Sequence, residues 1–174
     1  MNTGKVYQSI TQLVAAYKAK LTNMDEEDFT RIPPIGGWSY SEVYSHIFDS
    51  SLLSLLALNN CAKGEGEIKP THFVVKMILL FGSLPLGKRY KVPKRLAERV
   101  KKINLMAAEQ FIVDFELQLA KIYPLTEKAD PKIKSKHPRL GYLNAKQWLK
   151  FIEIHLNHHL NQLGRIEKGF QKSE

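Results

Sequence analysis

Two histidines near the carboxyl-terminal end of the chain have the spacing of metal ligands. His155 and His159 are four residues apart, so in an α-helix they lie on one face, separated by about 40° of arc. Gln162 follows His155 by seven residues and projects from nearly the same face, where it can hydrogen-bond a ligand or a bound water. The pair predicts two imidazole ligands for one divalent ion. The alternative is that both rings pack in the core and hydrogen-bond other side chains.

His46 is the third ligand that the residues predict. It falls in the middle of an apolar helical segment, where an imidazole without a partner would be costly. Asp49, three residues further on, can orient an imidazole through its second nitrogen or bind the metal directly. Leu156, Asn157 and His158 fill the interval of the pair, so the glutamate of the His-Glu-x-x-His motif is absent. This absence disfavours a zinc protease of that type, and His158 is expected at the edge of the site.

Apolar residues at helical spacing predict the elements that position these histidines in the first half of the chain. An apolar stripe from Val6 to Leu21 predicts a helix that follows a cap at Thr3. The acidic and Pro-Gly-rich residues 25–37 predict a long loop. Ser39 and Glu42 form a capping box, which predicts a helix from Tyr40 to about Cys61. His46 lies inside that helix.

The second half of the chain shows three further helical patterns. Residues 71–84 predict a well-buried helix, although their β-branched residues also allow a strand. A stripe over residues 104–122 predicts a helix that ends before Pro124. Asn144 is the expected cap of the histidine-bearing helix, which should end close to Gly169. Without convincing alternating strands, these patterns predict an all-α protein, a bundle of four or five long helices, in which facing helices commonly build metal sites.

Length and composition favour one domain over residues 1–174, with 44% hydrophobic and 25% charged residues. A single cysteine, Cys61, and an amino terminus without the continuous apolar core of a signal peptide favour a cytoplasmic protein. The most apolar run, residues 73–86, is interrupted by Lys76, Gly82 and Pro85 and is too short to span a bilayer. We therefore expect no membrane-spanning segment and no membrane partner.

The formal charge of +9 is concentrated in two runs. Residues 88–102 carry eight basic residues against one acidic residue, and residues 128–139 carry five against one. Both runs contain proline and are expected to be connections, where they are solvated surface or attract anions such as a small substrate. A nucleic-acid partner is not expected, because no DNA- or RNA-binding motif is present and few aromatic residues lie among the lysines.

Two segments around these histidines resemble the signature segments of the DinB-like superfamily. They are residues 37–47, with the sequence GWSYSEVYSHI, and residues 155–163, with the sequence HLNHHLNQL. The stretch HPRLGYL at residues 137–143, followed by Gln147 and Trp148, is similar to a branch of that superfamily without an assigned reaction. The resemblance extends over nearly the whole chain, but its specificity is in these segments.

The resemblance implies a four-helix bundle with a long crossover and a metal ion held by His46, His155 and His159. Zinc or nickel is the ion expected first, with iron and manganese as alternatives, because imidazole suits all of them. Related families include enzymes that use low-molecular-weight thiols for S-transfer or isomerisation, and related bundles often pair into homodimers. A thiol cofactor and a homodimer are therefore expectations that the resemblance adds.

Two functions from different classes follow. Three neutral imidazoles leave coordination positions open, which is typical of a catalytic site, and a divalent ion there lowers the pKa of a bound water or thiol. The leading hypothesis is a metal-dependent transferase or hydrolase acting on an anionic small molecule. The alternative is a module without turnover, in which the metal only ties two helices together. Trp38, Trp148 and Cys61 are interpreted as packing residues.

Overall fold

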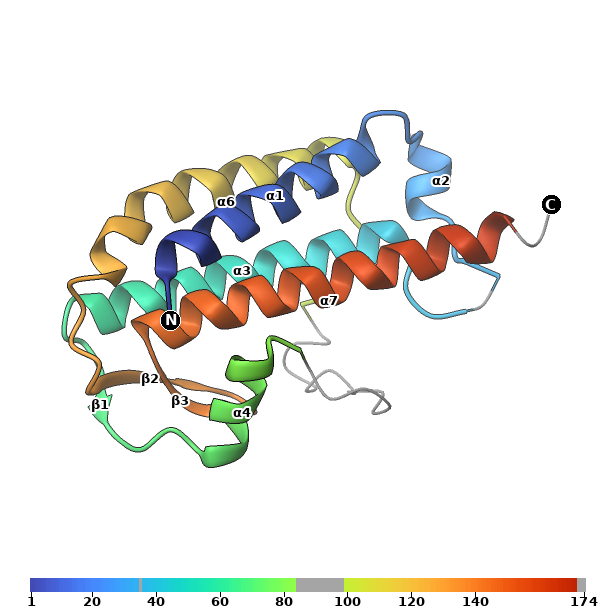
Figure 1. The fold of residues 1–174 in the computed structure, drawn as a ribbon. Helices are drawn as coiled ribbons and strands as arrows, with labels where there is room; N and C mark the ends of the chain where they lie inside the picture. The colour runs from blue at the N-terminus through green and yellow to red at the C-terminus, as the bar shows by residue number, and fades with distance from the viewer. Residues whose placement is uncertain (35, 84–98, 172–174) are drawn as a thin grey trace.

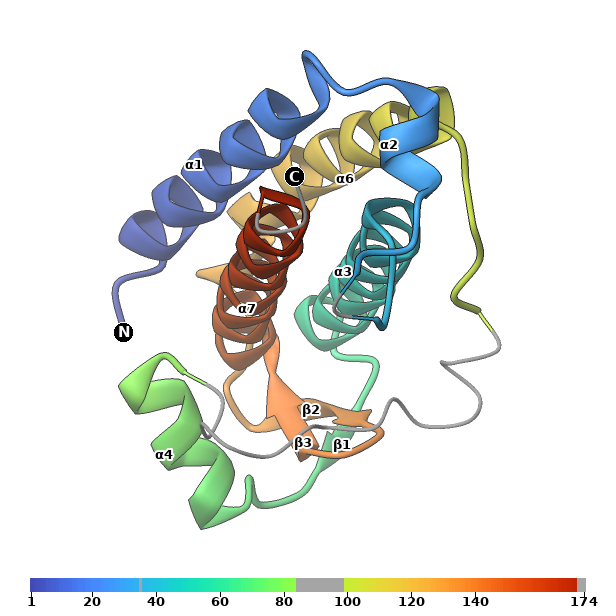
Figure 2. The same cartoon turned by 90° about the vertical axis from the view of Figure 1, so that its right-hand side faces the viewer.

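The computed structural model describes residues 1–34, 36–83 and 99–171. Four long helices form a bundle: α1 (Thr3–Leu21), α3 (Tyr40–Ala62), α6 (Leu105–Thr126) and α7 (Ala145–Gln171). Figure 1 shows α3 and α6 running in the same direction, so the chain between them must return along the length of the bundle. Seen from the end in Figure 2, α7 lies between α1 and α3. The predicted four-helix bundle with a long crossover is confirmed.

Capping residues define where the long helices begin. The side chain of Ser39 accepts a hydrogen bond from the backbone N–H of Glu42, whose carboxylate accepts one from the Ser39 N–H, so the predicted capping box is present at the start of α3. At α7 the Asn144 side chain accepts from the Gln147 N–H at 3.0 Å. The cap of α1 is Asn2 and not Thr3 as predicted, because the Asn2 side chain accepts from the Lys5 N–H at 3.0 Å.

The bundle core is rich in aromatic side chains from α1, α3 and α6. Tyr17 packs edge-on against Tyr44 and Phe48, and Phe48 packs against Phe115. Both buried hydroxyls have partners, since Tyr17 donates to the Leu156 carbonyl and Tyr44 donates to the Tyr17 carbonyl, each at 2.8 Å. These two bonds avoid the cost of an unpaired buried donor and fix the distances among α1, α3 and α7.

Two short elements depart from the predictions. The residues expected to form a loop contain α2 (Glu26–Thr30), because Asp25 caps it through the Asp28 N–H and acidic residues fill its first turn. Pro124 lies inside α6 and not beyond its end. It lies in the last turn of the helix, where it removes the backbone hydrogen bond that an N–H at this position would donate.

Three short strands and one helix form a lobe at one end of the bundle, and this lobe includes residues that were predicted to be a connection. It consists of β1 (Glu67–Ile68), α4 (Phe73–Phe81), β2 (Ile133–His137) and β3 (Gly141–Asn144), with an antiparallel sheet in the order β1-β2-β3. Part of the second basic run is therefore strand, because its lysines alternate with Ile133 and Ser135 and pair with both neighbouring strands. α4 is a helix but not well buried, since only Val75 of its residues is buried.

The remaining predictions concern the first basic run, two packing residues and a membrane span. Most of the first basic run, residues 88–98, lies outside the described residues. Cys61 and Trp148 are buried, as expected of packing residues. None of the helices among the described residues is both long and apolar enough to cross a bilayer.

Candidate metal centre

The three predicted histidines meet between α3 and α7. His46 projects from α3, and His155 and His159 project from neighbouring turns of α7. One nitrogen from each ring can be chosen so that all three lie within 4.8 Å of one another. In the described parts of the chain, no other set of three His, Cys, Asp or Glu side chains comes as close. The structure therefore brings together the residues that the sequence singled out.

The hydrogen-bond partner of His159 indicates which of its two ring nitrogens keeps a lone pair for the other histidines. Its Nδ1 lies 2.8 Å from the Gln162 Oε1. A carboxamide oxygen can only accept, so Nδ1 carries the proton and Nε2 keeps its lone pair in the neutral ring. Gln162 therefore lies where its hydrogen bond can fix the tautomer of a metal-binding histidine without touching the metal itself.

His155 is held in the same tautomer by α3. Its Nδ1 lies 3.4 Å from the Ser50 Oγ, and that hydroxyl already donates its single proton to the Ile47 carbonyl at 3.1 Å. While it donates to Ile47, Ser50 can accept from Nδ1 of His155, and Nε2 of His155 is then unprotonated as well. No local pattern in the sequence indicates this role of Ser50, because it depends on the packing of α3 against α7.

The two Nε2 atoms lie 3.1 Å apart. Two lone pairs directed at one another at that distance repel, and a shared cation removes the repulsion. Nitrogens bound to one zinc ion at roughly 2.0–2.1 Å in a tetrahedral arrangement are roughly 3.3 Å apart. The separation and the tautomers of these two rings therefore suit a shared divalent ion.

Burial keeps all three rings neutral, which is the form that binds metal. Burial lowers the pKa of His46 to about 4, a shift that the nearby Asp49 carboxylate partly opposes. Burial also holds the pKa of His155 and of His159 well below the ordinary value, and the neighbouring histidines lower both further. No proton needs to be displaced from the facing nitrogens at neutral pH.

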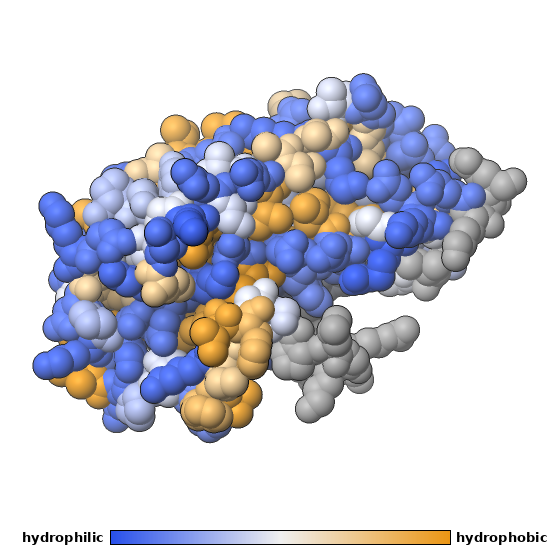
Figure 3. All heavy atoms as spheres, in the orientation of Figure 1, coloured by the Kyte–Doolittle hydropathy of each residue, from blue (hydrophilic) through white to orange (hydrophobic). Residues whose placement is uncertain are grey.

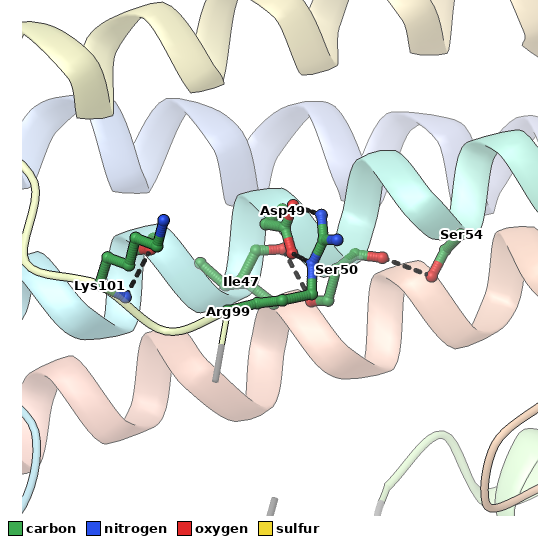
Figure 4. Close-up of polar contacts among 7 residues, drawn as sticks. Ile47, Asp49, Ser50, Ser54, Arg99 and Lys101 are labelled. Atoms are coloured by element: carbon green, nitrogen blue, oxygen red, sulfur yellow. Dashed lines mark hydrogen bonds and ion pairs between the residues drawn. The ribbon is translucent and has the colours of Figure 1, made fainter. Parts of the chain in front are cut away.

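Asp49 has a different partner from the one predicted. Figure 4 shows its carboxylate directed at the guanidinium of Arg99, with bonds of 2.8 Å from Nε and 2.6 Å from one terminal nitrogen. Both of these bonds come from Arg99, and Asp49 is not a member of the three-histidine cluster. Asp49 lies one turn from His46, so it influences that ring through its charge.

The chain from Arg99 to Ile103 is fastened along α3 beside the histidines. Ser41 accepts from the Ile103 N–H and donates to the Ile103 carbonyl, both at 2.7 Å, and Ser45 accepts from the Lys101 N–H at 3.3 Å. Ser41, Ser45 and Asp49 are spaced by four residues, so one stripe of α3 holds this segment, which we call the strap. The described end of the first basic run therefore lies along the part of α3 that contains His46, and Figure 4 shows Arg99 and Lys101 beside that helix.

Aromatic rings surround the histidine cluster. Trp38 lies 5.1 Å from the His46 ring and is stacked 6.4 Å from the His159 ring. On the other side, Phe151 is stacked 5.2 Å from His155 and packs against His137 at 4.6 Å. Trp38 was interpreted as a packing residue without a link to the site. Its contact with both His46 and His159 depends on the fold, which brings the residues before α3 against α7.

His137 and His158 are the other histidines near the site. His137 ends β2, where its Nδ1 accepts from the backbone N–H groups of Arg139 and Leu140 at 3.1 and 3.0 Å. Burial lowers its pKa to about 4, helped by the charge of Arg139. The His158 ring lies 5.2 Å from that of His159, outside the close group, as predicted for the edge of the site.

Comparisons with known proteins place the chain in a family. The sequence profile of the DinB superfamily matches residues 10–163, so the chain belongs to the DinB superfamily. A search of curated protein sequences finds no match.

Three solved structures share the fold. One is YfiT from Bacillus subtilis, described as a probable metal-dependent hydrolase with an unusual four-helix bundle topology; it has a TM-score of 0.63 and 14% identity, with 95% of this chain and 86% of that chain covered. The second is a mycothiol-dependent maleylpyruvate isomerase, with a TM-score of 0.63, 14% identity, 94% of this chain and only 61% of that longer chain. The third is the four-helix bundle protein TT2238, with a TM-score of 0.53, 19% identity, and coverage of 94% and 98%.

Proposed function

We propose that this DinB superfamily protein is a metal-dependent enzyme that acts on a small molecule, with His46, His155 and His159 as the metal ligands. Zinc or nickel is the ion we expect first. A low-molecular-weight thiol is the co-substrate we favour, in an S-transfer reaction or an isomerisation. The structural relatives described as a probable metal-dependent hydrolase and as a mycothiol-dependent isomerase support this class of chemistry.

The observation that carries the proposal is the meeting of three neutral imidazoles between α3 and α7, with the Nε2 atoms of His155 and His159 only 3.1 Å apart. Gln162 and Ser50 lie where they can accept the Nδ1 protons of these two rings. A core histidine pair without a metal would be more stable if one ring donated to the other. With Gln162 and Ser50 as acceptors for the two Nδ1 protons, both Nε2 lone pairs remain for a shared cation.

An ion held by three neutral imidazoles supplies uncompensated positive charge and open coordination positions, which lower the pKa of a bound water or thiol. The surrounding residues of this chain orient the reactants. Trp38 offers a ring face beside His46 and His159. Arg99 and Lys101 on the strap place positive charge along the same helix, which suits an anionic substrate.

Elemental mass spectrometry on the untagged protein tests the ligand set. We expect about one equivalent of a transition metal in the wild type, as for a single site, and its loss in His46→Ala, His155→Ala and His159→Ala. His158→Ala is the matched control, because this residue neighbours His159 but is not in the close group. Metal content unchanged in all three variants, or absent from the wild type after reconstitution, would overturn the proposal.

A metal-stabilised module without turnover is the second candidate function. It is favoured by the origin of the ligands on two helices, since an ion shared by α3 and α7 joins them as a cross-link. The two functions differ in one assay: the metal-loaded protein is incubated with thiols and electrophilic acceptors. Turnover that disappears in His159→Ala supports the enzyme, and a full panel without turnover supports the module.

A further inference from the structure

α4 exposes an apolar stripe away from the bundle. Phe73, Val74, Leu80 and Phe81 are 71%, 54%, 74% and 72% exposed. In a helix these positions span an arc of about 120°, with Met77 in its middle. Figure 3 shows the corresponding apolar surface gathered over α4 at the lower side of the molecule. Exposed patches of this kind usually mark a surface that another molecule covers.

The opposite face of the same helix is also apolar. Val75 is buried, and Leu79 packs against the core where α4 meets α7. A helix that is apolar on all sides is normally covered on all sides. The inner face of α4 accounts for its attachment to the protein. Among the described residues, the outer stripe adds nothing to that attachment.

The charge around α4 indicates what covers the stripe. Residues 63–83 and 127–144, which form the lobe and its connections, contain eight basic and four acidic residues. The chain after α4 continues in sequence into the basic run that begins at Lys88. Lys76 borders the stripe on α4 itself and is exposed, so its charged end can remain in water while its stem lies on an apolar surface.

We propose that the α4 lobe docks on the surface of an anionic lipid bilayer, with the stripe inserted at the interface and the lysines against the headgroups. An interfacial helix needs an apolar face and flanking basic residues, and it does not need the length of a spanning helix. A second copy of this chain fits less well, because two positively charged lobes repel and a nine-residue helix offers a small contact area. The proposal replaces our expectation of no membrane partner, which depended only on the lack of a spanning segment. It is independent of the metal site.

Vesicle co-sedimentation tests the proposal with the full chain. We expect the protein to sediment with vesicles of phosphatidylglycerol and phosphatidylcholine, to do so less as salt is raised, and to remain in solution with phosphatidylcholine alone. The double variant Leu80→Glu, Phe81→Glu should weaken binding by more than about tenfold. Leu117→Glu is the matched control, because Leu117 is 65% exposed on α6, outside the lobe, and it should bind as the wild type does.

A conservative variant covers the case in which the double variant misfolds. Phe81→Trp should show a blue shift of its added fluorescence with anionic vesicles and none with zwitterionic vesicles, compared with the wild type. No sedimentation of the wild type with anionic vesicles, or equal binding by the double variant, would overturn the proposal. So would a wild-type dimer in analytical ultracentrifugation that the double variant converts to monomer, if no vesicle binding accompanies it.

Discussion

At the scale of single residues, proton placement gives the histidine cluster its chemical character. Gln162 accepts the Nδ1 proton of His159, and Ser50 is placed to accept that of His155. Each acceptor fixes a ring orientation as well as a tautomer. Ligand geometry in this site therefore depends on residues that would not touch the metal.

Gln162→Ala should weaken metal binding without removing it. The variant frees the His159 ring to rotate and to exchange tautomers, and loss of such a partner typically reduces affinity about 10–100-fold. Competition with a chromophoric chelator measures the change. Gln110→Ala is the control, because Gln110 is exposed on α6, where its side chain donates to Asp114 of the same helix. An unchanged affinity in Gln162→Ala would show that the hydrogen bond does not orient the ligand.

His137 should make the metal-free protein lose stability in mild acid. Its pKa is about 4 in the folded protein and near 6.5 when unfolded. Between these values the unfolded chain binds more protons, so stability falls as the pH drops from 6.5 to 4 and falls no further below 4 on account of this group. Its share is up to about 3 kcal/mol.

Urea unfolding across this pH range measures that effect. His137→Asn is the test variant, because its side-chain oxygen can replace Nδ1 as acceptor for the turn amides but does not titrate. We expect a shallower loss of stability than in the wild type. The same slope in both proteins would mean that His137 does not titrate with a lowered pKa.

At the scale of elements, side chains of α3 hold the strap. Ser41 is buried and bonds both backbone groups of Ile103. By contrast, the Arg99–Asp49 pair at the other end of the strap is largely exposed on the arginine side, and exposed ion pairs contribute little. The strap is therefore anchored most firmly at Ile103.

Ser41→Ala should destabilise the protein by about 1–3 kcal/mol, because it leaves the Ile103 N–H and carbonyl without their partner. Ser45→Ala should cost less, since its bond to Lys101 is longer, at 3.3 Å. Chemical denaturation of both variants measures the difference. Equal losses in the two variants would contradict the assignment of Ser41 as the main anchor.

At the scale of the whole molecule, a metal ion would connect the two halves of the bundle. His46 lies before the long crossover and the pair on α7 lies after it, so a shared ion closes a large loop of the chain. The same crossover carries the apolar α4 and the strap. The predicted ligand His46 and the side chains that hold the strap thus lie on the same helix, α3.

Metal removal should lower the melting temperature of the wild type. At a free metal concentration of 100 times Kd the ion adds about 2.7 kcal/mol, which corresponds to roughly 5–10 °C for a chain of this size. Differential scanning calorimetry with and without a chelator measures the shift. His46→Ala should melt at the same temperature in both conditions, and a chelator-induced shift in that variant would argue for a metal elsewhere.

The sequence by itself determined the four long helices and the histidines between them. Helical periodicity and local caps depend on residues within a few positions, as at Ser39 with Glu42 and at Asn144 with Gln147, so they can be recognised without the fold. The four-residue spacing of His155 and His159 is local in the same way. Gln162 could be found for the same reason.

Only the tertiary structure decided the contacts between segments far apart in the chain. Asp49 was expected at a histidine, but the strap brings Arg99 to it from 50 residues away. Ser50 and Trp38 gain their places at the site from the packing of α3 and its preceding loop against α7. The β1-β2-β3 sheet and the exposure of α4 also depend on distant partners, because strand pairing and burial are properties of the neighbours and not of the local residues.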